Sequence, residues 1–156
     1  MDSPSSPSHA TSPKKRVLLV DDDVGVRETL GRVLVSEHFD VIFAADGNEA
    51  AAQFVAGRPH IILLDLNMPV RGGWSAFRFM HTARPAVPVV VITARPNQHP
   101  QASELGVDAL MEKPLDLAVL LRAIEALLSE TDTERANRRT NPDFKAANLN
   151  VASRWI

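Results

Sequence analysis

The sequence predicts an α/β fold in which five parallel strands alternate with five helices that cover both faces of the sheet. Short apolar runs occur at 17–20, 40–44, 60–65, 87–93 and 108–112. Three of these runs are apolar at successive positions, as expected for strands that are buried on both faces. Segments of helical period separate the runs, and this alternation is typical of a parallel sheet with crossover helices.

The first three helices are indicated by apolar stripes and end residues. One covers about 24–36, where valines and leucines recur at helical spacing. The next spans 48–57, with Asn48 as the expected N-cap and Gly57 suited to its end. The third covers 74–82, after a glycine pair that we expect to be flexible.

The last two helices differ in strength. The fifth follows Asp116, a candidate N-cap, and its leucines and isoleucine form a pronounced amphipathic repeat. The fourth lies between Pro96 and Gly106, where a second proline, Pro100, also falls. Because proline is tolerated only near a helix start, this helix is expected to span barely two turns and to be mobile.

One folded domain is predicted, covering residues 14–130. Residues 1–13 are mostly Ser, Pro and small polar residues, which indicate a disordered arm. Residues 131–156 form a polar tail that we expect to be partly helical or disordered, with any helix stopped at Asn141–Pro142. The tail is too short for a helix-turn-helix or catalytic output domain.

Composition narrows the class of protein. With 17 basic and 19 acidic residues the net charge is −2, so no global field favours nucleic acid or a membrane surface. Arg138 and Arg139 are interpreted as solvated tail residues rather than a nucleic-acid patch. The absence of cysteine excludes disulfides and thiolate metal sites. Without a secretion signal or a membrane-spanning run, the expected location is the cytoplasm.

Chemically active side chains stand at the carboxyl ends of four predicted strands. Asp21 and Asp22 follow the first strand, and Asp65 ends the third. Thr93 and Lys113 stand at the ends of the fourth and fifth. Because these ends gather at one edge of a parallel sheet, all five side chains are expected to share one pocket.

A pocket with three carboxylates needs a positive charge, because like charges in close proximity repel. A divalent cation with oxygen ligands meets this need, and Mg²⁺ suits a site with few protein ligands because it retains water and binds phosphate oxygens. Lys113 supplies a second positive charge. Neutralised in this way, Asp65 stays ionised and can act as a nucleophile toward phosphorus.

The segment from about 14 to 130 resembles the receiver domains of two-component response regulators, whose minimal single-domain form is the bacterial chemotaxis regulator. The resemblance rests on "LLVDDD", "ILLDLNMP" followed by "GG", "VVVITA" and "EKPL", in the family's order and near its spacing. It implies a flavodoxin-like (βα)5 fold. The implied function is a phosphorylation-dependent signalling switch.

By this resemblance, Asp65 is the phosphoacceptor and receives a phosphoryl group from the phosphohistidine of a sensor kinase or phosphotransfer protein. Asp22 would bind Mg²⁺ directly, Asp21 mainly through water, and Asn67 through its backbone carbonyl, with Asp65 also part of the metal site. The family also uses a threonine and a lysine at the positions of Thr93 and Lys113 to hold phosphoryl oxygens.

Two further features concern residues near the fifth strand. The family's Lys-Pro bond is commonly cis, which implies the same for Lys113–Pro114. Three residues before Lys113 the family usually has an aromatic residue whose rotation reports phosphorylation, but here it is Leu110. The resemblance implies output by binding a downstream protein. The departure at Leu110 indicates that the output face works differently from that of the family.

Two alternatives stay open. One is a degenerate receiver that binds partners without phosphorylation, which Leu110 slightly favours. The other is a Mg²⁺-dependent phosphatase of the haloacid dehalogenase type with an aspartate nucleophile, which Gly25 in "DDDVG" disfavours. If the protein is instead the phosphorylation-dependent switch, we expect it not to be an enzyme beyond self-phosphotransfer and autodephosphorylation at Asp65. We also expect a monomer or weak dimer that binds no nucleic acid or membrane.

Overall fold

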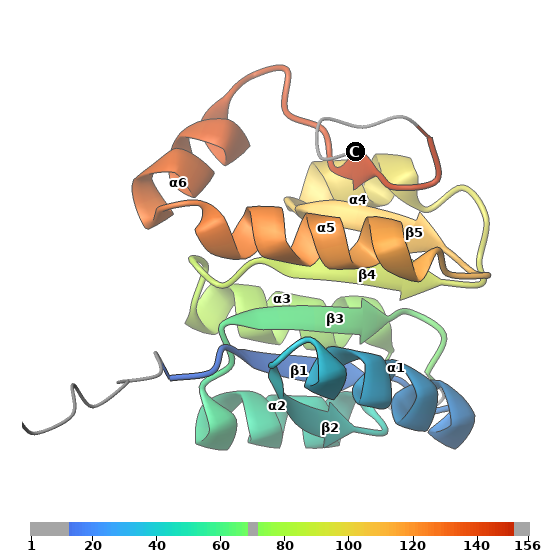
Figure 1. The fold of residues 1–156 in the computed structure, drawn as a ribbon. Helices are drawn as coiled ribbons and strands as arrows, with labels where there is room; N and C mark the ends of the chain where they lie inside the picture. The colour runs from blue at the N-terminus through green and yellow to red at the C-terminus, as the bar shows by residue number, and fades with distance from the viewer. Residues whose placement is uncertain (1–12, 69–71, 152–156) are drawn as a thin grey trace, which may run out of the picture.

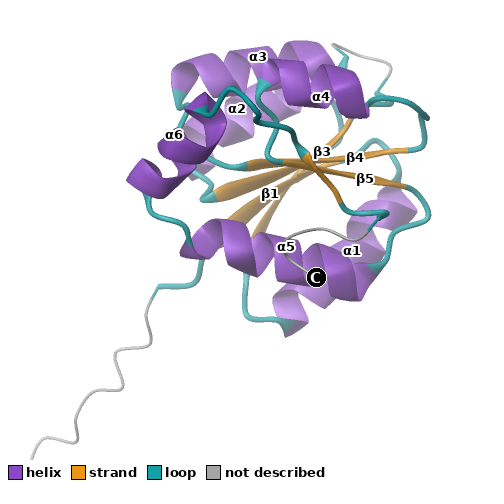
Figure 2. Ribbon diagram, turned by 90° about the horizontal axis from the view of Figure 1, so that it is seen from above, coloured by secondary structure: helices purple, strands orange, loops and turns teal. Residues whose placement is uncertain are grey.

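The computed structural model describes residues 13–68 and 72–151, which form a parallel sheet between two layers of helices (Figures 1 and 2). The strands are β1 (Arg16–Val20), β2 (Asp40–Ala44), β3 (Ile61–Asp65), β4 (Val89–Thr93), β5 (Ala109–Glu112) and β6 (Ala147–Asn148). The helices are α1 (Val24–Ser36), α2 (Gly47–Gly57), α3 (Gly73–Ala83), α4 (His99–Leu105), α5 (Leu117–Ser129) and α6 (Asp132–Thr140).

The strands are arranged in the order β2-β1-β3-β4-β5-β6. The first five strands lie at the predicted apolar runs. The side chains of β3 and β4 are buried along their whole length, which explains why these runs are apolar at successive positions. Helices α1 and α5 cover one face of the sheet, and α2, α3 and α4 cover the other (Figure 2). The prediction of an α/β fold with a parallel sheet covered on both faces is confirmed.

The number of strands was wrong by one, because β6 adds a sixth. It pairs with β5 in parallel, with Ala147 opposite Ala109 and Asn148 opposite Leu110. Two residues are too few to show a period of two in the sequence. This strand is defined by its hydrogen bonds to a distant edge and not by a local pattern.

Several helix ends lie where the sequence predicts them. Asp116 is the N-cap of α5, α2 ends at Gly57, and α4 has seven residues between the expected limits. Asp23 is the N-cap of α1. The N-cap of α2, however, is Asp46 and not Asn48: its backbone is extended, and its carboxylate accepts a hydrogen bond from the Glu49 amide at 2.8 Å. Because the Asp46 carboxylate caps the helix, α2 begins at Gly47, before the predicted cap Asn48.

The segment after α5 folds back on the domain. The chain breaks from helical geometry at Glu130, and α6 begins with its own capping box between Thr131 and Glu134. Helix α6 ends at Thr140, before the Asn-Pro pair, as expected. Most of the predicted disordered arm, residues 1–12, and the last five residues lie outside the described part.

The interpretation of Arg138 and Arg139 as solvated was wrong. Their side chains are only 10% and 13% exposed, and they bind Asp108 at 2.8 and 2.7 Å. Asp108 is buried at the start of β5, where it also accepts a hydrogen bond from the Val89 amide. A buried carboxylate needs such partners, so a contact that is distant in sequence decides where these arginines lie.

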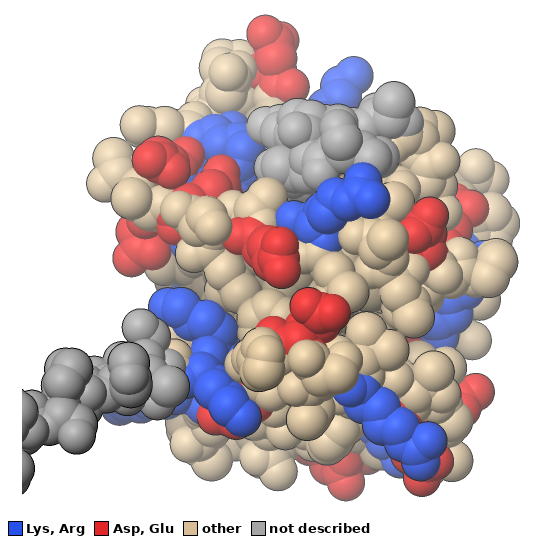
Figure 3. All heavy atoms as spheres, in the orientation of Figure 1, with Lys and Arg blue, Asp and Glu red and all other residues tan. Residues whose placement is uncertain are grey.

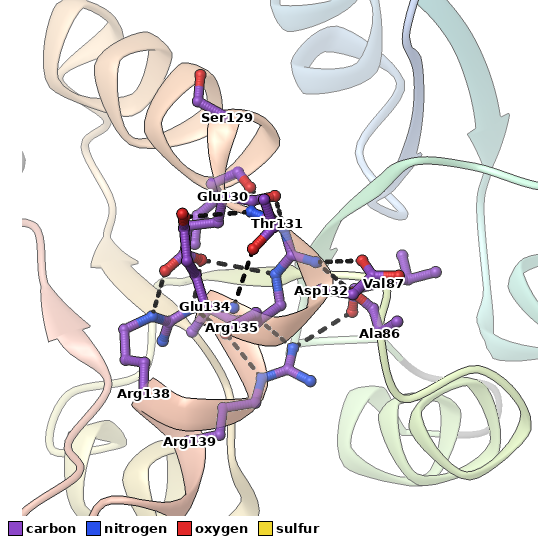
Figure 4. A network of polar contacts seen from close by, with 12 residues as sticks. Ala86, Val87, Ser129, Glu130, Thr131, Asp132, Glu134, Arg135, Arg138 and Arg139 are labelled. Carbon is purple, nitrogen blue, oxygen red and sulfur yellow. Dashed lines mark hydrogen bonds and ion pairs between the residues drawn. The ribbon is translucent and has the colours of Figure 1, made fainter.

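Arg135 forms the other anchor of α6, as Figure 4 shows. It is buried, and it donates to the carbonyl oxygens of Leu127 at 2.6 Å and Ala86 at 2.7 Å. It thereby satisfies a carbonyl near the C-terminal end of α5. None of the helices in the described ranges combines the length and apolar character required to cross a bilayer.

Candidate functional site

Three carboxylates meet at the carboxyl-terminal edge of the sheet. Asp21 and Asp22 directly follow β1, and Asp65 is the last residue of β3, the neighbouring strand. One oxygen from each lies within 4.8 Å of the others. Asp21 and Asp65 are 0% and 1% exposed, whereas Asp22 is exposed to solvent. The structure therefore brings the three predicted acids together, two of them from inside the fold.

Local hydrogen bonds orient the two buried carboxylates. The Asp23 amide donates to Oδ1 of Asp21 at 2.9 Å, and the Asn67 amide donates to Oδ1 of Asp65 at 3.0 Å. In both turns the side chain accepts from the amide two residues on, a pattern that aspartate readily adopts after a strand. The second oxygen of each carboxylate is turned toward Lys113.

Lys113 joins the site from the end of β5. Its ammonium group lies 3.0 Å from Oδ2 of Asp21 and 3.7 Å from Oδ2 of Asp65. Its backbone amide donates to the carbonyl of Thr93 at 2.7 Å, which ties it to β4. The Lys113–Pro114 peptide bond is cis, as the resemblance implied.

Burial and charge shift the pKa values in this cluster. Burial raises the pKa of Asp65, and the charges of Asp21 and Asp22 raise it further against the opposing Asn67 hydrogen bond and Lys113. Burial alone would lower the pKa of Lys113, but its hydrogen bond to Asp21 and the charge of Asp65 outweigh this and raise it. The cluster thus retains an excess of negative charge beside a firmly protonated lysine.

Thr93 and Asn67 stand at the same edge with different exposure. Thr93 is buried at the end of β4, and its hydroxyl accepts a hydrogen bond from the Arg95 amide at 2.9 Å. Asn67 is exposed, and its side-chain oxygen lies 3.5 Å from the Arg95 guanidinium. Arg95 therefore contacts both residues at the rim of the site.

Two supporting residues were missed or misinterpreted in the sequence. The guanidinium of Arg27 donates to the Asp21 carbonyl at 2.7 Å, and no sequence pattern marks this contact. Gly73 was expected to be flexible, but it is buried at the start of α3. A Cβ there would lie 2.6 Å from the Leu66 Cα and 2.8 Å from the Asp65 carbonyl oxygen, so only glycine lets α3 approach the end of β3. The glycine pair after "NMP" was the available signal.

The donor set fits a hard divalent cation. Its ligand atoms are all carboxylate oxygens, which is the chemistry that Mg²⁺ and Ca²⁺ prefer. Two of these carboxylates are buried, and among the residues that the structure describes Lys113 is the cation that forms salt bridges with them, so a further positive charge is electrostatically favoured. Because the third carboxylate is exposed, the site also opens to solvent, from which a phosphate-bearing molecule can approach.

The chain matches known proteins in sequence. The family profile of the response regulator receiver domain matches residues 17–125. The chain is 34% identical over 143 residues to the response regulator MprA of Mycobacterium bovis, covering 90% of this chain and 62% of the relative. It is 41% identical over 120 residues to the transcriptional regulatory protein PrrA of Mycobacterium tuberculosis, covering 76% and 51%. The chain thus spans only about half to three fifths of these relatives.

Solved structures show the same fold. The CheY-like receiver domain protein of Methanospirillum hungatei superposes with a TM-score of 0.71 at 25% identity, covering 80% of this chain and 98% of that one. A LuxR-family two-component response regulator from Aurantimonas superposes with a TM-score of 0.68 at 29% identity, covering 82% and 99%. Each alignment covers nearly the whole of the solved structure and about four fifths of this chain.

Proposed function

This chain belongs to the receiver domain family of response regulators, and from that premise we propose that it is a phosphorylation switch with Asp65 as the phosphoacceptor. The observation that carries the proposal is the arrangement around Asp65. One of its oxygens is held by the Asn67 amide, while the other lies 3.7 Å from the Lys113 ammonium. The Asp65 carboxylate is therefore oriented by a hydrogen bond, can lose its proton, and lies next to a positively charged ammonium group.

In the proposed reaction, a carboxylate oxygen of Asp65 attacks the phosphorus of a phosphohistidine or a small acyl phosphate. A new O–P bond forms while the bond from phosphorus to the imidazole nitrogen or acyl oxygen breaks, and the electron pair leaves with that donor. Lys113 neutralises part of the negative charge on the transferred group. Hydrolysis of the aspartyl phosphate by water restores the carboxylate, so each chain carries one phosphoryl group at a time.

We propose that Mg²⁺ binds to Asp21, Asp22, Asp65 and the backbone carbonyl of Asn67. When bound, this ion offsets the charge of the carboxylates and of the phosphoryl oxygens. Asp21 keeps its salt bridge to Lys113 and thereby positions the ammonium. The three carboxylate oxygens within 4.8 Å of one another support this assignment.

The Thr93 hydroxyl is proposed to donate a hydrogen bond to a phosphoryl oxygen after transfer. Its position at the buried end of β4, the strand next to β3, supports this role. The backbone of the same residue accepts from Lys113, so one residue contributes to the site in two ways.

The partners follow from this chemistry. A sensor histidine kinase or phosphotransfer protein is the proposed donor, in the cytoplasm, and a protein is the proposed target. The named relatives are a response regulator and a transcriptional regulatory protein, and this chain spans only a part of each, so the transcriptional role in the second name belongs to that whole protein. That this chain itself binds no nucleic acid stays a prediction. On the face shown in Figure 3, acidic and basic side chains are interspersed.

Intact mass spectrometry after incubation with acetyl phosphate and Mg²⁺ tests the proposal. The parent chain should gain one phosphoryl group, and Asp65→Asn should gain none. Asp40→Asn is the matched control, because Asp40 is an exposed aspartate at the opposite end of the sheet, and it should be phosphorylated like the parent.

The same assay distinguishes the alternatives. A folded parent that gains no phosphoryl group from acetyl phosphate, and none from a phosphorylated histidine kinase, would support a degenerate receiver and refute the switch. Multiple turnover of a phosphate ester would support the phosphatase hypothesis.

A further inference from the structure

The last described segment, residues 141–151, closes the outer edge of β5 (Figure 1). The Ala147 amide donates to the Asp108 carbonyl at 3.0 Å, and the Leu149 amide donates to the Leu110 carbonyl at 2.9 Å. The side chains of both donors are buried. The segment is therefore packed as part of the sheet and not laid loosely over it.

The same segment also contacts α4. The Ala146 amide donates to the hydroxyl of Ser103 at 3.0 Å, and the ring of His99 contacts the Ala146 carbonyl. At its other end, the segment is tethered by α6, where Arg138 and Arg139 bind buried Asp108. Such a tether keeps the local concentration of the segment at the edge high, so even weak contacts further along remain formed.

Asn150 makes the contact that reaches the functional site. Its side-chain oxygen accepts from the Glu112 amide at 2.7 Å, and its side-chain nitrogen donates to the Glu112 carbonyl at 3.2 Å. The Asn150 side chain thus continues the ladder where β6 has ended, and it satisfies both backbone groups of the last residue of β5. The turn is fixed in place because the Asn150 amide donates to Oδ1 of Asn148 at 3.1 Å.

Glu112 directly precedes Lys113, whose ammonium binds Asp21 and Asp65. On the inner side, the Lys113 amide is held by the Thr93 carbonyl at 2.7 Å. On the outer side, the two Asn150 hydrogen bonds are the contacts made by the segment at this level. Strand ends open locally at low free energy, so releasing the outer side gives the Lys113 backbone more conformations.

We propose that Asn150 is a positioning residue: by clamping Glu112 it holds Lys113 where the ammonium meets Asp65 and the group transferred to it. This inference rests on the proposed function. Because coupling between two binding events is reciprocal, a phosphoryl group or its analogue at Asp65 tightens the docking of residues 141–151 by the same factor.

Titration of the full chain with beryllofluoride and Mg²⁺, a phosphoryl analogue that assembles on a carboxylate, tests the first half of the proposal. We expect Asn150→Ala to bind the analogue at least about fivefold more weakly than the parent, the lower end of typical coupling factors. Asn137→Ala is the matched control, because Asn137 is an exposed asparagine of α6, and its affinity should equal that of the parent.

Hydrogen exchange tests the second half on the unaltered chain. Beryllofluoride should slow exchange of the Ala147 and Leu149 amides, which donate to β5, by the factor lost in Asn150→Ala. A residue that serves stability alone would lower the melting temperature without changing affinity for the analogue. Equal affinity of the parent and Asn150→Ala, or exchange that the analogue leaves unchanged, overturns the inference while the proposed function stands. Failure of the parent to bind the analogue instead overturns the proposed function.

Discussion

Replacing Asp65 with asparagine should stabilise the metal-free protein, although it removes the proposed phosphoacceptor. Asp21 and Asp65 oxygens lie within 4.8 Å of each other, which corresponds to a repulsion of about 3.5 kcal/mol at an effective dielectric of 20. The Lys113 ammonium, 3.7 Å from Asp65, attracts it by about 4.5 kcal/mol on the same scale. The two terms nearly cancel.

Desolvation then decides the sign. Asp65 is 1% exposed, so its charge is removed from water while the neutral amide loses less on burial. We expect Asp65→Asn to gain about 1 to 2 kcal/mol at pH 7, or about 3–6 °C in melting temperature for a chain of this size. The raised pKa of Asp65, caused first by its burial, agrees with this direction.

The pH dependence follows from the same shift. Because the folded-state pKa of Asp65 lies above its ordinary value of 3.8, the folded protein holds this proton more tightly than the unfolded chain. The parent's stability relative to Asp65→Asn should therefore be greatest below pH 3.8. It should fall as the pH rises through the folded-state pKa and then level off.

Thermal unfolding in a chelating buffer, followed by circular dichroism, measures this effect, with Asp40→Asn as the exposed control. Added Mg²⁺ should then stabilise the parent more than Asp65→Asn, by about 2.7 kcal/mol at a hundredfold excess over the dissociation constant if the variant binds none. A variant that is less stable than the parent without metal, or equal stabilisation of both by Mg²⁺, would refute the electrostatic reasoning.

Three further measurements address other parts of the fold. Gly73→Ala should lower the free energy of unfolding, measured in urea, by about 2 kcal/mol, because its Cβ would lie 2.6 Å from the Leu66 Cα. Gly31→Ala is the control and should be nearly neutral, because its Cβ would meet the ring of the half-exposed Phe43, which can turn away. Equal losses would show that the close approach is not rigid. Burial lowers the pKa of His81, so the parent should lose stability relative to His81→Phe as the pH falls below about 6.5, where the unfolded chain binds more protons; parallel pH profiles would contradict this. Asp116→Ala should lose about 1 kcal/mol through its missing N-cap with unchanged Mg²⁺ affinity, and a change in that affinity would contradict the separation of cap and site.

The sequence by itself determined the five main strands and the gathering of Asp21, Asp22 and Asp65 at one edge. Both depend on local patterns: apolar runs mark buried strands, and an acidic residue directly after a parallel strand must emerge at its carboxyl end. The distances of the three carboxylates show how far that reasoning reaches. Such local patterns predict where the three carboxylates lie, but they do not predict which carboxylate oxygen accepts each hydrogen bond.

Only the tertiary structure decided the fate of the segment after α5. Arg138 and Arg139 lie in a polar segment that is typical of a solvated tail. Their side chains are nevertheless largely buried, because they form salt bridges with buried Asp108, which has no other cationic partner within the part described. Likewise, the sixth strand and the Asn150 clamp depend on the open edge of β5, some 40 residues earlier in the chain. Hydrogen bonds between distant backbones leave no period in the sequence, so these contacts appear only once the edge they complete has formed.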